Sequence, residues 1–269
     1  MKKLEIIKVG GAVVEEPQAL SALMGSFAGL AGERILVHGG GRTATRLAAS
    51  LGIETRMVDG RRVTDAPMRD VVTMVYGGLV NKQVVAGLQA QGVAALGLTG
   101  ADGDVVRSER RPPVIRTDGS VVDFGFVGDV RAVQAGRLAR LLEEELVPVI
   151  APLTHDGKGN LLNTNADTMA SAVACALAGL RDAAGDPVYA VTLTFCFEQP
   201  GVLRDPADPA SVIPQIDPAG FRTLVAEGVV SGGMVPKLEN AFAALDRGVG
   251  QVRITRYDDL SGGTLIVKE

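Results

Sequence analysis

The sequence is poor in the residue types that mark several classes of protein. It contains two cysteines, two histidines, three tyrosines and no tryptophan among 269 residues. Cys175 and Cys196 stand alone, without the spacing of a metal or redox motif, so we expect two buried apolar residues and no disulfide framework. His38 and His155 have no recognisable serine or cysteine partner, which argues against a nucleophilic triad.

The charge balance and the short apolar runs argue against nucleic acid and membrane as partners. The chain has 27 basic and 31 acidic residues, a net charge of −4 and no basic block, which argues against nucleic acid. No apolar run approaches the roughly 20 residues of a membrane span, and the first residues lead into a strand-like run rather than a signal peptide. We therefore expect a cytoplasmic protein that binds small molecules and neither nucleic acid nor membrane.

Lysine is also scarce, with 7 lysines against 20 arginines. Genomic base composition is the simplest explanation of this ratio. The scarcity nevertheless makes each lysine that stands inside a motif worth inspecting.

Short apolar runs alternate with helical stretches, which is typical of a mostly parallel sheet flanked by helices. The length suits one large α/β domain or two modest ones. The pattern predicts strands at 4–9, 34–38, 93–98, 147–151, 188–195, 251–255 and 264–268, and helices at 67–91, 131–145, 166–180, 218–227 and 235–247. Hairpins are expected at 114–124 and around the turn 156–160, and such hairpins often form a rim over a site.

Glycine turns follow the first two predicted strands. Gly10-Gly11 ends the first strand, and Gly39-Gly40-Gly41 ends the second. Because glycine allows the backbone to approach an anion and free amides at a helix start favour negative charge, the pair predicts a phosphate or carboxylate site. Neither turn is a Walker A loop. The second matches a variant of the dinucleotide fingerprint, with Asp59 near the expected acidic position, so a dinucleotide-binding oxidoreductase stays open as a distant alternative.

Four charged residues are candidates for chemistry. Lys8 lies beside the first turn on an otherwise apolar strand, and Lys237 follows another glycine-rich approach to a helix. The Lys8 ammonium, at the carboxyl end of a strand, could meet a transferring phosphoryl group as a point charge. Asp167 could orient both lysines, and Arg62 could clamp a carboxylate with its planar fork. Simpler roles remain open at this stage, such as surface lysines and capping of a helix by Asn165.

Taken together and in order, the motifs resemble the amino acid kinase family, and within it the branch that phosphorylates N-acetyl-L-glutamate. The matching segments are Ile7-Lys8-Val9-Gly10-Gly11, Val37-His38-Gly39-Gly40-Gly41, Gly60-Arg61-Arg62-Val63-Thr64, Asn81-Lys82, Gly97-Leu98-Thr99-Gly100-Ala101-Asp102-Gly103, Gly128-Asp129-Val130, Asn163-Thr164-Asn165-Ala166-Asp167 and Gly232-Gly233-Met234-Val235-Pro236-Lys237. The resemblance implies a three-layer α/β/α sandwich with an open, mostly parallel central sheet and small β-hairpins over the site. It also implies one domain over residues 1–269, in which residues 1–180 bind the amino acid and residues 181–269 bind ATP.

The resemblance further implies a reaction and a set of roles. The γ-phosphoryl group of ATP, which brings Mg²⁺ with it, would pass to the side-chain carboxylate of N-acetyl-L-glutamate in the second step of arginine biosynthesis. No protein metal site is expected. By motif position, Lys8 and Lys237 would neutralise the charge of the transferring group, and Asp167 would hold both lysines in place. Arg62 would bind the α-carboxylate, Asn163 would complete that pocket, and Gly40 and Gly41 would donate their amides to the acyl-amino acid. Gly10 and Gly11 would approach the phosphates. A carboxylate nucleophile is ionised near neutral pH and needs no general base, which agrees with a chain that has two histidines.

The chain departs from the family pattern at one motif. The usual Ser-Asp pair is replaced in the stretch 194–201, where Glu198 is the candidate acid for ATP binding. Lys8 lies too near the amino end for the extra helix of arginine-inhibited hexameric relatives, so we expect a homodimer without arginine feedback. N-succinylglutamate and carrier-linked aminoadipate stay open as substrates. A non-catalytic sensor of an amino acid or nucleotide is the alternative of another class.

Overall fold

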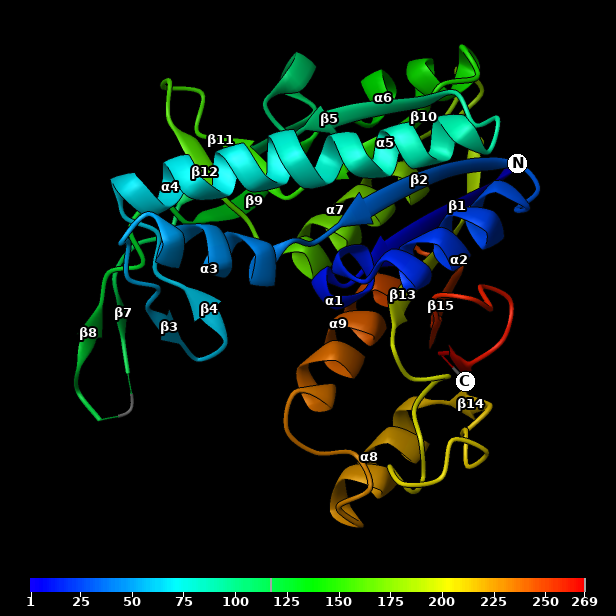
Figure 1. Cartoon of the computed structure of the whole chain (residues 1–269). Helices are drawn as coiled ribbons and strands as arrows, with labels where there is room; N and C mark the ends of the chain where they lie inside the picture. The colour runs from blue at the N-terminus through cyan, green and yellow to red at the C-terminus, as the bar shows by residue number, and fades with distance from the viewer. Residues whose placement is uncertain (117, 269) are drawn as a thin grey trace.

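The computed structural model describes residues 1–116 and 118–268, and its centre is an eight-stranded sheet (Figure 1). The strand order is β14-β16-β15-β13-β1-β2-β10-β5. The strands are β1 (Lys2–Val9), β2 (Glu33–His38), β5 (Ala95–Thr99), β10 (Val147–Ala151), β13 (Tyr189–Phe197), β14 (Gln215–Ile216), β15 (Gln251–Arg256) and β16 (Thr264–Ile266). In this sheet the pairs are parallel except for β15 with β16, so the predicted open, mostly parallel sheet is confirmed.

β1 lies in the middle because its side chains are apolar on both faces, as is typical of buried parallel strands. Leu4 and Ile6 enter the core on one side of the sheet, and Ile7 and Val9 enter the core on the other. The register pairs Val9 with the last residue of β2 and with a residue near the end of β13. The carboxyl ends of three neighbouring strands therefore meet at one edge, where both glycine turns begin.

Helices cover both faces of the sheet and complete the three layers. One core draws on α1 (Gly11–Glu15), α2 (Pro17–Ala28), α3 (Gly41–Ser50), α4 (Ala66–Val72), the π-helical turn η1 (Thr73–Val80) and α5 (Asn81–Ala90). The other core draws on α6 (Ala135–Glu143), α7 (Ala166–Ala178), α8 (Pro218–Ala226) and α9 (Met234–Asp246). Each helix buries an apolar face against the sheet, which is the physical reason for this architecture.

The predicted helix 67–91 is one continuous helical segment, Ala66–Ala90. By length and composition alone it could cross a membrane, with a mean hydropathy of 1.2. Its residues Val71, Val75, Val84 and Leu88 are fully buried in the core beneath the sheet. One side of the segment therefore belongs to the protein core, whereas Met74 and Leu79 are about half exposed.

A second, four-stranded sheet lies beside the main one. It has the order β12 (Leu161–Asn163), β11 (Leu153–His155), β6 (Val106–Arg110) and β9 (Gly128–Val133). The prediction of a helix from residue 131 was wrong at its start, because Val130 and Ala132 on either side of Arg131 pair with β6 and the helix begins at Ala135. The expected hairpin at the turn 156–160 is confirmed by β11 and β12.

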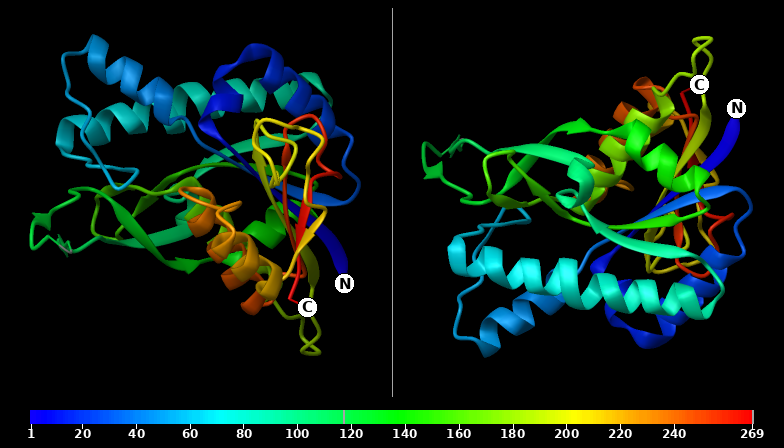
Figure 2. Two further views of the ribbon diagram at one scale, coloured as in Figure 1. Left: turned by 90° about the horizontal axis from the view of Figure 1, so that it is seen from below. Right: turned by 90° about the horizontal axis from the view of Figure 1, so that it is seen from above.

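Two further hairpins project together from one end of the molecule (Figure 2). One joins β3 (Met57–Val58) to β4 (Arg61–Arg62), and the other joins β7 (Val114–Ile115) to β8 (Val121–Val122). The second is the hairpin predicted at 114–124, although residue 117 lies outside the described residues. A short 3₁₀ turn, η2 (Asp102–Asp104), completes the elements.

Candidate active site

The two glycine turns touch each other at the carboxyl edge of the sheet. A Cβ atom at Gly11 would lie 3.2 Å from the amide nitrogen of Gly40 and 3.3 Å from that of Gly41. A Cβ atom at Gly39 would lie 3.0 Å from the amide nitrogen of Gly11. Only glycine therefore allows the two turns to approach so closely while their amides stay uncovered.

A pocket of about 220 Å³ opens beside these turns. It lies between the sheet edge, the β3–β4 hairpin and the start of α7. Its lining residues are Gly11, Gly39, Gly40, Gly41, Met57, Gly60, Arg61, Arg62, Tyr76, Val127, Pro152, Asn163, Thr164, Asn165 and Ala166. The structure thus brings together five of the predicted site residues, namely Gly11, Gly40, Gly41, Arg62 and Asn163.

Arg62 presents a buried guanidinium to this pocket. Its Nη2 atom donates to the carbonyl oxygen of Gly41 and to the hydroxyl of Thr45, both at 2.8 Å, and Nη1 donates to the hydroxyl of Thr55 at 3.2 Å. These acceptors are neutral, and among the described residues no carboxylate forms an ion pair with Arg62. Its positive charge is therefore available to an anionic ligand.

Asn163 also lines the pocket, lies at the end of β12 and is buried. Its side-chain amide donates to the hydroxyl of Thr64 at 3.0 Å, and that hydroxyl donates to the carbonyl oxygen of Arg62. Asn163 and Arg62 are therefore joined through one hydroxyl group. This connection fixes the Asn163 amide relative to the backbone of Arg62.

Lys8, Lys237 and Asp167 form a second group at the same edge. Lys8 Nζ lies 2.6 Å from Asp167 Oδ1, and both side chains are largely buried. The Phe197 ring lies beneath both ammonium groups, with its centroid 4.9 Å from Lys8 Nζ and 3.7 Å from Lys237 Nζ. The structure therefore unites the three residues that the sequence placed on two glycine approaches and one helix start.

The electrostatics of this group centre on Lys237. Burial is the main cause that lowers its pKa from the ordinary value, and the positive charge of Lys8 lowers it further. The carboxylates of Asp167 and Glu198 act in the opposite direction. Two ammonium groups lie on one ring, and only that of Lys8 forms an ion pair with Asp167 among the described residues, so the group carries surplus positive charge, which suits an anionic ligand such as a phosphate.

Two predicted ATP-binding residues lie outside the pocket lining. Gly10 is tied to the end of β13, because its amide donates to the carbonyl oxygen of Cys196 at 3.2 Å. The Glu198 side chain is 57% exposed and lies 4.0 Å from Arg42 Nη2, a surface pair that contributes little to stability. Its charge acts on Lys237, but among the described residues Glu198 forms no ion pair with either lysine.

Sequence reasoning missed two aromatic side chains at this edge. Phe197 occupies the stretch in which the family's Ser-Asp pair is replaced, and that replacement was the available signal. Tyr76 packs against Gly40, where a Cβ atom would lie 3.1 Å from the tyrosine ring, and burial raises the pKa of its hydroxyl. Nothing in the local sequence around Tyr76 distinguishes it from an ordinary core residue.

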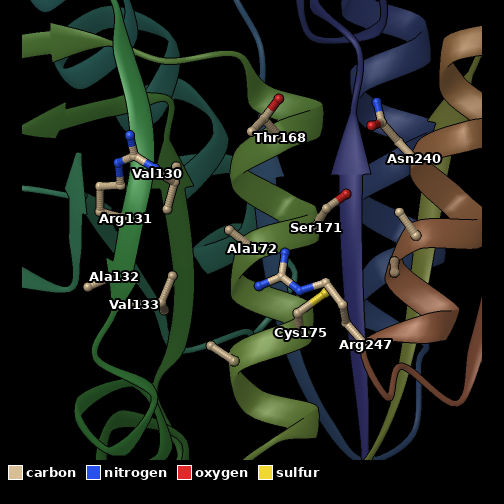
Figure 3. A pocket seen from close by; sticks show the side chains of 13 residues that line it. Val130, Arg131, Ala132, Val133, Thr168, Ser171, Ala172, Cys175, Asn240 and Arg247 are labelled. Atoms are coloured by element: carbon tan, nitrogen blue, oxygen red, sulfur yellow. The ribbon is translucent and has the colours of Figure 1, made fainter. Parts of the chain in front are cut away.

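Another groove of about 230 Å³ lies between β9, α7 and α9 (Figure 3). Arg131, Ser171, Cys175 and Arg247 are among its lining residues, and none of the predicted site residues is. Burial raises the pKa of the Cys175 thiol, and it raises that of Cys196 to about 12. Both cysteines are buried, as expected.

In the portion of the chain that the structure describes, no group of three or more His, Cys, Asp or Glu side chains is placed to hold a metal ion. The carboxylate groups at the candidate site are Asp167, which is engaged by Lys8, and the exposed Glu198. A divalent cation at this edge would therefore be held mainly by its phosphate ligands.

Comparison with known proteins agrees with this arrangement. The acetylglutamate kinase of Phocaeicola vulgatus is 58% identical over 99% of each chain, and that of Bacteroides fragilis is 55% identical over 99% of this chain and 98% of its own. The solved N-acetylglutamate synthase from Neisseria gonorrhoeae, complexed with coenzyme A and N-acetyl-glutamate, has a TM-score of 0.78 at 21% identity over 99% of this chain and 60% of its own. Carbamate kinase from Giardia lamblia, with a TM-score of 0.66 at 14% identity and 99% coverage of both chains, shares the fold. The model of the amino acid kinase family matches residues 3–256, and the chain therefore belongs to that family.

Proposed function

We propose that this protein is an acetylglutamate kinase, which transfers the γ-phosphoryl group of ATP to the side-chain carboxylate of N-acetyl-L-glutamate. One observation carries the proposal: the pocket with a buried arginine free to bind a carboxylate lies at the same sheet edge as the Lys8–Asp167 ion pair and Lys237, whose ammonium lies on the same Phe197 ring as that of Lys8. The names of the similar curated proteins support the same activity.

In the proposed reaction Arg62 binds the α-carboxylate and Asn163 closes the pocket around the acyl-amino group. The side-chain carboxylate then points toward the glycine turns, where the amides of Gly40 and Gly41 hold it. Because this carboxylate is already ionised, no side chain has to remove a proton. Catalysis consists of holding two anions in line, which converts a bimolecular encounter into a step within one complex.

Lys8 and Lys237 stabilise the charge that develops on the phosphoryl oxygens during transfer. Asp167 keeps the two ammonium groups together against their mutual repulsion, so that both are in place before the reaction. Gly10 and Gly11 let the backbone approach the phosphates, and Glu198 lies nearby on the nucleotide side. ATP would bring Mg²⁺ with it, which neutralises phosphate charge and is held mainly by the nucleotide.

The proposal divides the chain into an amino-acid-binding region, about residues 1–180, and an ATP-binding region, about residues 181–269. All residues that line the pocket fall between Gly11 and Ala166, whereas Lys237 and Glu198 come from the later region. The phosphoryl group would cross between the two regions at the lysines.

We further propose a cytoplasmic homodimer without arginine feedback. Exposed apolar side chains on the long helical segment, Met74 at 52% and Leu79 at 50%, are available for a contact between copies. Sedimentation of the purified protein tests this, and a hexamer or inhibition by arginine would contradict it.

The test of the activity is direct. Purified protein with Mg-ATP and N-acetyl-L-glutamate is expected to form an acyl phosphate, which hydroxylamine traps as a hydroxamate. N-succinylglutamate is assayed in parallel, because Arg61 lines the same pocket and could meet a second carboxylate. If the protein prefers N-succinylglutamate, that compound is the substrate. If no capped acidic amino acid gives a product, the result favours a non-catalytic sensor.

A further inference from the structure

Hydrogen-bonded polar side chains connect the long helical segment to the second glycine turn. The two central residues are His38 and Asn81, and neither has a role in the reaction proposed above. His38, the last residue of β2, is fully buried, and Asn81, the first residue of α5, is 1% exposed. His38 Nδ1 lies 2.8 Å from the carbonyl oxygen of Gly39, and His38 Nε2 lies 3.1 Å from Asn81 Nδ2. The two residues thus connect the helix to the turn that lines the pocket.

The contacts select one tautomer of the histidine. Asn81 Nδ2 also lies 2.9 Å from the carbonyl oxygen of Val149, and Lys82 Nζ lies 3.1 Å from Asn81 Oδ1. The nitrogen of Asn81 therefore donates to two acceptors, and its oxygen accepts from Lys82. His38 Nε2 must then accept, so Nδ1 carries the proton and donates it to the carbonyl oxygen of Gly39.

Charge agrees with a neutral imidazole. Burial lowers the pKa of His38 to about 4, and the positive charge of Lys82 acts in the same direction. The bond to the Gly39 carbonyl opposes both without overcoming them. His38 therefore keeps one proton, on Nδ1, throughout the neutral range.

The orientation of one peptide group follows from this bond. The Gly39 carbonyl and the Gly40 N–H belong to the same planar trans peptide, so they point in opposite directions. Holding the carbonyl toward His38 aims the Gly40 N–H away from it. Gly40 lines the pocket, its nitrogen lies where the two turns meet, and no hydrogen bond from this N–H is found among the described residues.

Gly97 on β5 leaves space for the side chains of Asn81 and Lys82. A Cβ atom there would lie 2.1 Å from Asn81 Oδ1 and 2.6 Å from Lys82 Nζ. Glycine at this position lets the Asn81 amide reach Val149 and His38 at the same time. The family-like motif that begins at Gly97 thus has a packing function that its sequence does not reveal.

We propose that His38 and Asn81 are positioning residues, which aim the Gly40 amide at the reacting carboxylate by holding the Gly39 carbonyl on the opposite side of the shared peptide. The inference rests on the proposed function for its substrate. It predicts that the two side chains affect the step in which the carboxylate is held and attacks, while ATP binding is little changed.

The kinetic test uses four variants. His38→Leu and Asn81→Leu are expected to lower kcat/KM for the acyl amino acid by roughly 10- to 100-fold, less than the loss of a whole oxyanion donor, with KM for ATP within about 2-fold. His38→Asn should recover most of the loss in His38→Leu, because its amide nitrogen takes the place of Nδ1 and can donate to Gly39. Gln83→Leu, an exposed amide on the same helix, is the control and should match the wild type.

Stability and NMR separate positioning from a structural role. If His38→Asn and His38→Leu lose activity equally at similar thermal stability, the inference is overturned. In the wild type, ¹⁵N NMR of the histidines should show His38 protonated at Nδ1 and untitrated down to about pH 5, because its pKa is lowered to about 4. A proton on Nε2 would refute the inference whether or not the variants fold, and absence of hydroxamate in the wild type would instead refute the proposed function.

Discussion

Asp167→Asn is the change that tests the lysine group most directly, because it removes one charge and almost no volume. Lys8 Nζ and Asp167 Oδ1 are 2.6 Å apart, and the side chains are 7% exposed for Lys8 and 21% exposed for Asp167. At an effective dielectric constant near 20, two unit charges at this distance interact by about 6 kcal/mol. Desolvation offsets part of that energy, and removing one partner of a buried pair costs about 3–5 kcal/mol. We expect the free energy of unfolding to fall by about 3 kcal/mol.

The same substitution should change the pH dependence of the reaction. Asp167 raises the pKa of Lys237 against the stronger effect of burial, so its loss lowers that pKa further. Lys237 acts in its charged form, and a group with a lower pKa loses its proton earlier as pH rises. The alkaline limb of the kcat profile should therefore move to lower pH. Urea denaturation and kcat measured between neutral and alkaline pH give both readouts.

A matched control lies two residues away. Asn165 caps α7 by accepting a hydrogen bond from the Thr168 amide at 3.0 Å, and it has no contact with the lysines among the hydrogen bonds of the described residues. Asn165→Ala should cost about 1 kcal/mol of stability and leave the alkaline limb in place. If Asp167→Asn also leaves that limb unchanged, or destabilises no more than the control, the assigned electrostatic role of Asp167 is wrong.

Changes at three further residues test other features of the site. Arg62→Lys should raise KM for the acyl amino acid by roughly 10-fold or more, because an ammonium cannot reproduce the planar fork, and an unchanged KM would refute carboxylate binding there. Gly11→Ala should lower both kcat and thermal stability, since its Cβ would lie 3.2 Å from the Gly40 amide nitrogen and the two turns would have to separate; kcat measured well below the melting transition separates the loss of activity from misfolding. Phe197→Leu should lower the free energy of unfolding by about 1 kcal/mol by removing the ring beneath two ammonium groups, and Phe197→Tyr should keep it.

The regular elements of the fold were predictable because each has a local signal. The strand around Lys8, the helix 67–91 and the helix after Asn165 all lie where apolar periodicity and capping residues place them. The prediction was wrong at Arg131, where a helix was expected and β9 continues. Pairing with β6, a strand that was not predicted, overrides the local preference of that segment.

The site was predictable to a similar extent and for the same reason. Glycine turns after strands, isolated lysines and a carboxylate at a helix start carry their signal in neighbouring residues. Sequence could not anticipate the Phe197 ring beneath both lysines, because no local pattern relates the end of β13 to the starts of α7 and α9. The link from Asn81 through His38 to the Gly39 carbonyl was hidden for the same reason.

The sequence by itself therefore determined the order of most strands and helices, the two glycine turns and the types of charge available for the reaction. These are properties of residues close together along the chain, where backbone freedom and apolar spacing act directly. The tertiary structure alone decided which lysine pairs with Asp167, which histidine nitrogen keeps its proton and which way the Gly40 amide points. Those properties depend on burial and on distances between residues far apart in the sequence, which are set only when the sheet has formed and its helices have packed against it.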